Sequence, residues 1–149
     1  MYRLRTPQAP LALTTAGLIP FVALAGLTLL YRDDPALMQA AGVWLITYGA
    51  IILTFLGGIR WGLEIAQRDK PRFIELGGSI VSPIVSWGLI LLFFFWRPSA
   101  LIFMMLAASF LIFWFWDFAS TRLPSWYQRL RIWPTLGAVL SLGVAAWAF

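Results

Sequence analysis

The chain of 149 residues contains neither cysteine nor histidine. Without a thiol there is no disulfide, no thiolate nucleophile and no cysteine-bound iron–sulfur cluster. Without an imidazole there is no histidine-ligated haem, no zinc site of the common kinds and no Ser-His relay. The six acids and four methionines show no ligand spacing that would indicate another metal site. We therefore expect no metal and no cofactor, and the sequence indicates no catalytic residue.

Charged residues are also scarce, at 11% of the chain, whereas 61% of residues are hydrophobic and the mean hydropathy is +0.83. The apolar residues form five runs, and a helix of about 20 residues is needed to cross a bilayer. We predict an all-α fold, a polytopic membrane bundle of five transmembrane helices within one integral membrane domain, residues 1–149. The expected spans are about 11–30, 40–62, 73–96, 98–116 and 132–149.

The basic residues are distributed unequally between the two sides of these spans. Only Arg32 and Arg97 fall on one side, and the other nine fall on the side of the N-terminus. Because cytoplasmic loops carry the excess of Lys and Arg, we expect a cytoplasmic N-terminus and an external C-terminus. The nine are Arg3, Arg5, Arg60, Arg68, Lys70, Arg72, Arg122, Arg129 and Arg131.

The N-terminal run resembles a secretory signal peptide, since Arg3 and Arg5 precede it. Its apolar part is of span length, however, so we interpret it as an uncleaved first helix. No Arg- and Ser-rich transit peptide precedes it, and we expect a multi-pass protein of the bacterial inner membrane. The basic residues are split among three short membrane-flanking segments, which favours contact with the lipid bilayer and argues against nucleic acid as a partner.

Prolines mark several helix ends and interruptions. Asp34 followed by Pro35 predicts a helix N-cap with proline at the first helical position. Pro20 and Pro83 lie inside the first and third runs, where each removes a backbone donor and kinks the helix. Ser79 and Ser82 are placed to satisfy carbonyl groups that the third run leaves free.

The second run carries the densest pattern of small and aromatic residues. Gly58 and Gly62 are four residues apart and share one helix face, with Gly57 on an adjacent flank. Tyr48 and Phe55 add an aromatic ridge and a phenol that needs a hydrogen-bond partner. We interpret these five residues as a packing seam, within the bundle or with a partner; a ligand-facing groove is the alternative.

Four charged residues are predicted to lie at one depth on the cytoplasmic side, and they form the candidate polar cluster. Arg60 lies near the end of the second run, where it either extends to the headgroups beside Trp61 or forms a buried ion pair or anion site. A bridge from Arg60 to Asp117 is geometrically possible. The cluster consists of Arg60, Glu64, Glu75 and Asp117.

The segment before the fifth run has an amphipathic pattern. Its apolar residues recur at three- and four-residue spacing from Trp126 to Trp133, while Arg129 and Arg131 are expected to face headgroups. We predict an interfacial helix over residues 123–133 that leads into the fifth span, with Pro134 marking the bend. Its expected role is anchoring, and docking of a partner is the alternative.

These motifs together resemble a bacterial multi-span membrane family of unknown function that is shared with mitochondrial transmembrane protein sixty-nine. The resemblance covers nearly the whole chain and implies a multi-span membrane protein, with an analogy to energy-transducing membranes. It is carried by Tyr48-Gly49-Ala50, Phe55-x-Gly57-Gly58-x-Arg60-Trp61-Gly62, Ser82-Pro83-x-x-x-Trp87, Asp117 and Leu123-Pro124-Ser125-Trp126-Tyr127-x-Arg129-Leu130-Arg131.

Three functions fit these features. The first is a non-catalytic accessory or assembly factor of a membrane complex, with a membrane-protein partner or a homo-oligomer. The second is a small transporter or ion pathway that uses the cytoplasmic-side polar cluster, although few charges lie deep in the spans. The third is a lipid-modifying enzyme, although no nucleophile and base stand together in the sequence.

Overall fold

The computed structural model describes residues 6–96, 99–119 and 123–149. Across these residues all regular secondary structure is helical, and five helical segments are long and apolar enough to cross a membrane. The predicted five-span helical membrane bundle is therefore confirmed. Four of the basic residues counted in the sequence analysis lie outside the described residues, namely Arg3, Arg5, Arg97 and Arg122. Pro98, at the expected start of the fourth span, also lies outside them.

The first span consists of two helices, α1 (Gln8–Ala16) and α2 (Leu18–Leu30). Pro20 lies four residues after Ala16 and cannot donate to its carbonyl, so the hydrogen-bond ladder is interrupted where α1 ends. Across the interruption, the phenol of Tyr48 donates a hydrogen bond to the Gly17 carbonyl oxygen at 2.8 Å. The kink predicted from Pro20 thus coincides with a junction that a neighbouring helix holds in place.

The second span, α3 (Pro35–Gln67), has 33 residues and is about 50 Å long, so it exceeds the hydrocarbon thickness of a bilayer. Asp34 accepts hydrogen bonds from the backbone amides of Ala36 and Leu37, and Pro35 occupies the first helical turn. This confirms the predicted cap. The helix extends beyond the apolar run at both ends because its polar turns continue the same hydrogen-bond ladder.

The remaining spans are α4 (Phe73–Phe95), α5 (Ala100–Ala119) and α6 (Ser125–Ala148). Pro83 lies inside α4 and leaves the carbonyl of Ser79 without its helical donor. The hydroxyl of Ser82 donates to that carbonyl at 3.2 Å, as the sequence predicted. Pro134 lies inside α6, which passes through it as one helix. The residues predicted as an interfacial helix leading into the fifth span form, from Ser125 onward, the first turns of that same helix.

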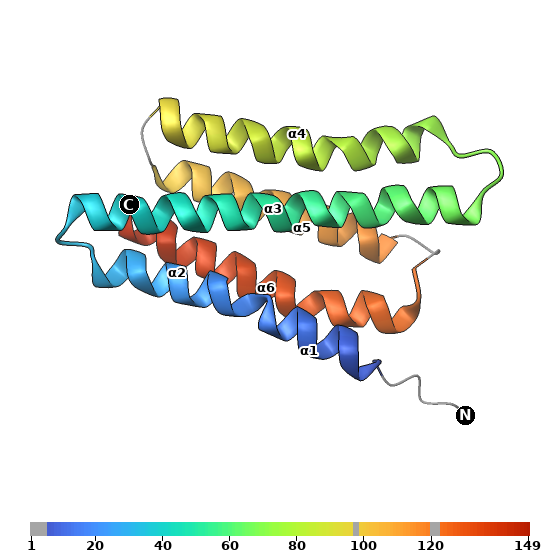
Figure 1. Ribbon diagram of the computed structural model, residues 1–149, viewed down its shortest axis with the longest axis horizontal. Helices are drawn as coiled ribbons and strands as arrows, with labels where there is room; N and C mark the ends of the chain where they lie inside the picture. The colour runs from blue at the N-terminus through green and yellow to red at the C-terminus, as the bar shows by residue number, and fades with distance from the viewer. Residues whose placement is uncertain (1–5, 97–98, 120–122) are drawn as a thin grey trace.

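The helices run side by side along the long axis of the bundle (Figure 1). α3 packs between α2 and α4, and α6 packs between α2 and α5. α1 begins at one end of the bundle and α6 finishes at the other (Figure 1). The core between the helices is rich in phenylalanine, with edge-to-face contacts between Phe21 and Phe110 and between Phe93 and Phe103.

Candidate functional site

The polar cluster lies at the end of the bundle where α3 finishes and α4 begins. On α3, the buried face passes through Leu53, Gly57, Arg60 and Glu64, at spacings of three and four residues. The same face that packs against the core therefore directs two charged side chains inward in the last turns of the helix. Glu75 in the first turn of α4 and Asp117 near the end of α5 approach the same level.

Arg60 is the central residue of this cluster. Its guanidinium lies 3.3 Å from Oε2 of Glu75 and 3.6 Å from Oδ1 of Asp117. It also stacks over the ring of Trp116, with its central carbon 3.9 Å from the ring centroid. Only 7% of the residue is exposed. Of the two interpretations of Arg60, the structure supports the buried ion pair and not the extension to the headgroups.

Asp117 joins Arg60 to a residue that the sequence analysis left outside the cluster. Nε of Arg131 donates a hydrogen bond to Oδ2 of Asp117 at 3.2 Å, and both side chains are buried. Asp117 therefore lies between two guanidinium groups, one from α3 and one from α6. The expectation that Arg131 faces lipid headgroups is wrong, because the continuous helix turns it inward. The signal was present in the sequence: Arg131, Thr135 and Ala138 follow helical spacing through Pro134.

Glu64 belongs to a second set of pairs beside the first. Its Oε1 lies 3.2 Å from Nε of Arg68 and accepts a hydrogen bond from the backbone amide of Arg72 at 2.8 Å. The guanidinium of Arg72 in turn contacts Oε1 of Glu75 at 2.6 Å. These contacts close the connection between α3 and α4, and they link Glu64 to Arg60 through Arg72 and Glu75.

The five residues of the predicted packing seam have different surroundings. A Cβ atom at Gly57 would clash with the hydroxyl of Ser82 and lie 2.5 Å from the carbonyl oxygen of Ser79, so Gly57 allows α3 and α4 to approach closely. Gly58 and Gly62 have open space beside them within the described residues. Tyr48 bonds to the α1–α2 junction, and Phe55 is exposed on the lipid-facing side.

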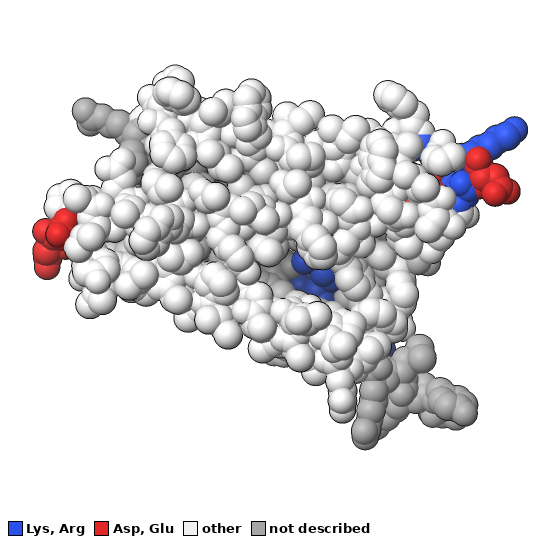
Figure 2. Space-filling model, in the orientation of Figure 1, with Lys and Arg blue, Asp and Glu red and all other residues white. Residues whose placement is uncertain are grey.

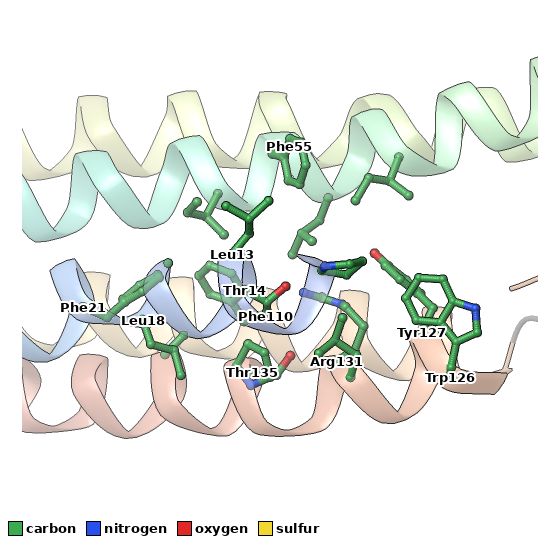
Figure 3. Close-up of a pocket in the computed structure, with 18 residues that line it drawn as sticks. Leu13, Thr14, Leu18, Phe21, Phe55, Phe110, Trp126, Tyr127, Arg131 and Thr135 are labelled. Atoms are coloured by element: carbon green, nitrogen blue, oxygen red, sulfur yellow. The ribbon is translucent and has the colours of Figure 1, made fainter. Parts of the chain in front are cut away.

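A pocket of about 490 Å³ opens beside the cluster, between α1, α2, α3 and α6, and Phe110 of α5 also lines it. In a space-filling view it appears as a hollow in an apolar face, with basic side-chain atoms visible at its floor (Figure 2). The basic residue that lines it is Arg131, which extends from α6 beside Thr135 (Figure 3). Phe55 from the predicted seam lines the opposite wall. Neither this pocket nor Arg131 was anticipated as part of a site.

The chemistry available at this end of the bundle is that of ion pairs and hydrogen bonds. Within the described ranges, no group of three or more His, Cys, Asp or Glu residues is arranged to hold a metal ion. Each carboxylate of the cluster contacts at least one guanidinium. The arrangement connects α3, α4, α5 and α6 and presents one face of Arg131 to the pocket.

Fold and site together define a multi-span helical membrane protein with a buried ion-pair network near one end. The chain belongs to the family described as "Protein of unknown function (DUF3429)", whose model matches residues 6–147. It is similar to "Transmembrane protein 69" of Xenopus tropicalis, with 37% identity over 91% of this chain and 53% of the relative. The chain is also similar to "Transmembrane protein 69" of Mus musculus, with 36% identity over 96% of this chain and 57% of the relative.

The chain thus spans about half the length of the curated relatives it matches. No solved structure matches it.

Proposed function

We propose that this protein is a non-catalytic accessory or assembly factor of a larger membrane complex. The observation that carries the proposal is the mutual pairing of the charged side chains in the polar cluster. Arg60, Glu75, Asp117 and Arg131 contact one another across four helices, so their charges are engaged in holding the bundle together. A general base or an ion relay needs a group that is free to exchange a proton or a ligand.

The lipid-facing edge of α3 supports a role in assembly. Ile51, Phe55, Gly58, Gly62 and Ile65 are all exposed and follow one another at spacings of three and four residues. The two glycines form a shallow, open section between bulky neighbours. Such small-residue edges allow a second membrane helix to approach closely, so the partner in this proposal is a helix of another membrane protein.

The proposal places the protein in a bacterial inner membrane with its N-terminus in the cytoplasm. The charge asymmetry supports this orientation. Arg68, Lys70, Arg72 and Arg129 lie toward the end of the bundle where the cluster is found, whereas Arg32 lies at the opposite end and stacks over Trp147. On the face that Figure 2 shows, charged residues lie at the two ends, and the belt between them is apolar except for the basic atoms in the hollow.

Gentle purification of the tagged chain from its native membrane, followed by quantitative mass spectrometry, tests the proposal. We expect a second membrane protein at a near-equal amount. Elution of the chain alone, or only as a homo-oligomer, would contradict an accessory role. In that case solute and lipid binding around Arg60 and Asp117 would be measured next.

A further inference from the structure

The pocket beside Arg131 contains two buried polar groups that lack hydrogen-bond partners in the described part of the chain. One is the Nη2 nitrogen of Arg131, and the other is the hydroxyl of Thr135. Arg131 is 7% exposed and Thr135 is 2% exposed, and both line the pocket. Burying a polar group without a hydrogen-bond partner costs free energy. An unpaired polar group that lines a pocket therefore indicates where a ligand atom would bind.

The charges around the pocket indicate the sign of the charge on that ligand. Among the described residues, the ion pairs of this network join four arginines to three acids. All six acids of the chain are in the described residues, and the other three lie at positions 33, 34 and 69. Arg68 and Arg72 are partly exposed at the connection between α3 and α4, whereas Arg131 is buried, lines the pocket and shares the carboxylate of Asp117 with Arg60. The partner that best suits the unpaired Nη2 nitrogen of this guanidinium is a single anionic group, because charge-assisted hydrogen bonds to a guanidinium are the strong ones.

The walls of the pocket indicate that the rest of the ligand is apolar. Tyr127 and Trp126 line the end nearest the start of α6, and Phe21, Phe110 and Ala138 line the deeper end (Figure 3). From Trp126 to Ala138 the pocket follows about 18 Å of α6. Phe55 and Leu13 flank it from exposed positions on α3 and α1, so it adjoins the surface that faces lipid.

We propose that this pocket binds one membrane amphiphile with a single anionic head, a carboxylate or a phosphate, and an apolar chain. The head accepts hydrogen bonds from Nη2 of Arg131 and from the hydroxyl of Thr135. The chain lies along α6 toward Phe21 and Phe110. A volume of about 490 Å³ lies within the range of small-molecule sites. This proposal does not depend on the assembly role, because it concerns the face between α1 and α6 and requires no protein partner.

Binding is measured on the full chain reconstituted in phosphatidylcholine nanodiscs. The probe is a C16 fatty acid with a diazirine at the end of its chain, which is crosslinked by light and mapped by peptide mass spectrometry. Oleic acid, dioleoyl phosphatidic acid, oleyl alcohol and inorganic phosphate are the competitors. The first two distinguish a carboxylate head from a phosphate head, and the last two separate the contributions of the charge and of the chain.

We expect crosslinks at pocket residues, including those near Phe21 on α2 and Phe110 on α5, where the end of the chain should lie. At least one of the two acidic amphiphiles should compete about tenfold better than oleyl alcohol, because a hydrogen bond between ions is worth that much. Inorganic phosphate should not compete. Equal competition by the alcohol, competition by phosphate alone, or crosslinks spread evenly over the five spans would overturn the proposal.

Three variants test the location without breaking the Arg131–Asp117 pair. Thr14→Trp places a large ring in the pocket from α1 and should reduce probe binding at least tenfold. Thr15→Trp is the matched control, since Thr15 is exposed, lies outside the lining and bonds only within α1; it should bind normally. Thr135→Val keeps the side-chain shape but removes the hydroxyl and should weaken binding about fivefold. Normal binding by both Thr14→Trp and Thr135→Val would overturn the proposal.

Discussion

Asp117 on α5 accepts a hydrogen bond from Arg131 on α6 while its second oxygen faces Arg60 on α3. One carboxylate therefore compensates two buried guanidinium groups from different helices. Breaking a buried pair by removing one partner is strongly destabilising, because the other charge stays buried without compensation. This relationship makes Asp117 the residue on which the packing of this end of the bundle depends most.

Replacing Asp117 by Asn should destabilise the protein by about 3–5 kcal/mol, because Arg60 loses one of its two carboxylates and Arg131 loses the acid that faces it. Asp69→Asn is the matched control: Asp69 is exposed in the connection between α3 and α4, and its loss should cost less than about 0.5 kcal/mol. Denaturant unfolding in detergent micelles measures both. Equal stabilities for the two variants would show that the cluster does not hold the helices together.

Gly57→Ala should destabilise the protein by about 1–3 kcal/mol, because the added methyl group meets the Ser82 hydroxyl and the backbone of Ser79 on α4. Its neighbour provides a direct comparison, since the Cβ of Gly58→Ala would enter open space. Alanine is also the better helix former, so Gly58→Ala should be neutral or slightly stabilising. Thermal unfolding of the two variants in one detergent distinguishes them, and the opposite order would contradict the close approach of α3 and α4.

Tyr48→Phe should cost about 1 kcal/mol, because it removes the hydrogen bond to the Gly17 carbonyl. The loss should be local, so hydrogen exchange should increase at the junction of α1 and α2 and remain unchanged in α5. Tyr31→Phe is the control at the opposite end of α2. Unchanged exchange at the junction in Tyr48→Phe would mean that the phenol does not hold the two helices together.

The natural absence of cysteine allows a direct test of orientation. Single cysteines in place of Asp69, between α3 and α4, and Asp33, between α2 and α3, would lie at opposite ends of the bundle. With a membrane-impermeant maleimide, Asp33→Cys should react in intact cells freed of their outer membrane, and Asp69→Cys only after the cells are opened. The reverse pattern would place the N-terminus outside.

The spans could be predicted because a segment inside a membrane must form its backbone hydrogen bonds internally, as a helix does, and must expose apolar side chains to lipid. Long apolar runs in the sequence meet both requirements. The contact between Arg60 and Asp117 could be predicted only as a possibility. Two residues at the same depth in the membrane need not lie on neighbouring helices. Arg131 was missed for a definite reason. Arg129 and Arg131 were both assigned to the headgroups, whereas the buried face of α6 continues through Pro134 and places Arg131 against Asp117.

The pocket could not be predicted from the sequence because residues of five helices line it, and most of these helices are distant from one another along the chain. Phe55 was expected in a seam or, alternatively, a ligand-facing groove, and it both lines the pocket and lies on the exposed edge of α3. Phe55 on α3 was singled out in the sequence, but the segments across the pocket, from α1, α2, α5 and α6, could not be assigned. Gly58 and Gly62 remain a predicted contact for a partner.

The most direct test of the assembly role is to compare two double variants in the native purification. Gly58→Leu with Gly62→Leu fills the open section of the α3 edge, while Gly26→Leu with Gly88→Leu adds the same bulk at open positions on α2 and α4. Both proteins should accumulate in the membrane to equal amounts. We expect the first to lose its stoichiometric membrane-protein partner and the second to retain it. Retention of the partner by both, or the absence of any partner from the unmodified chain, would contradict the account.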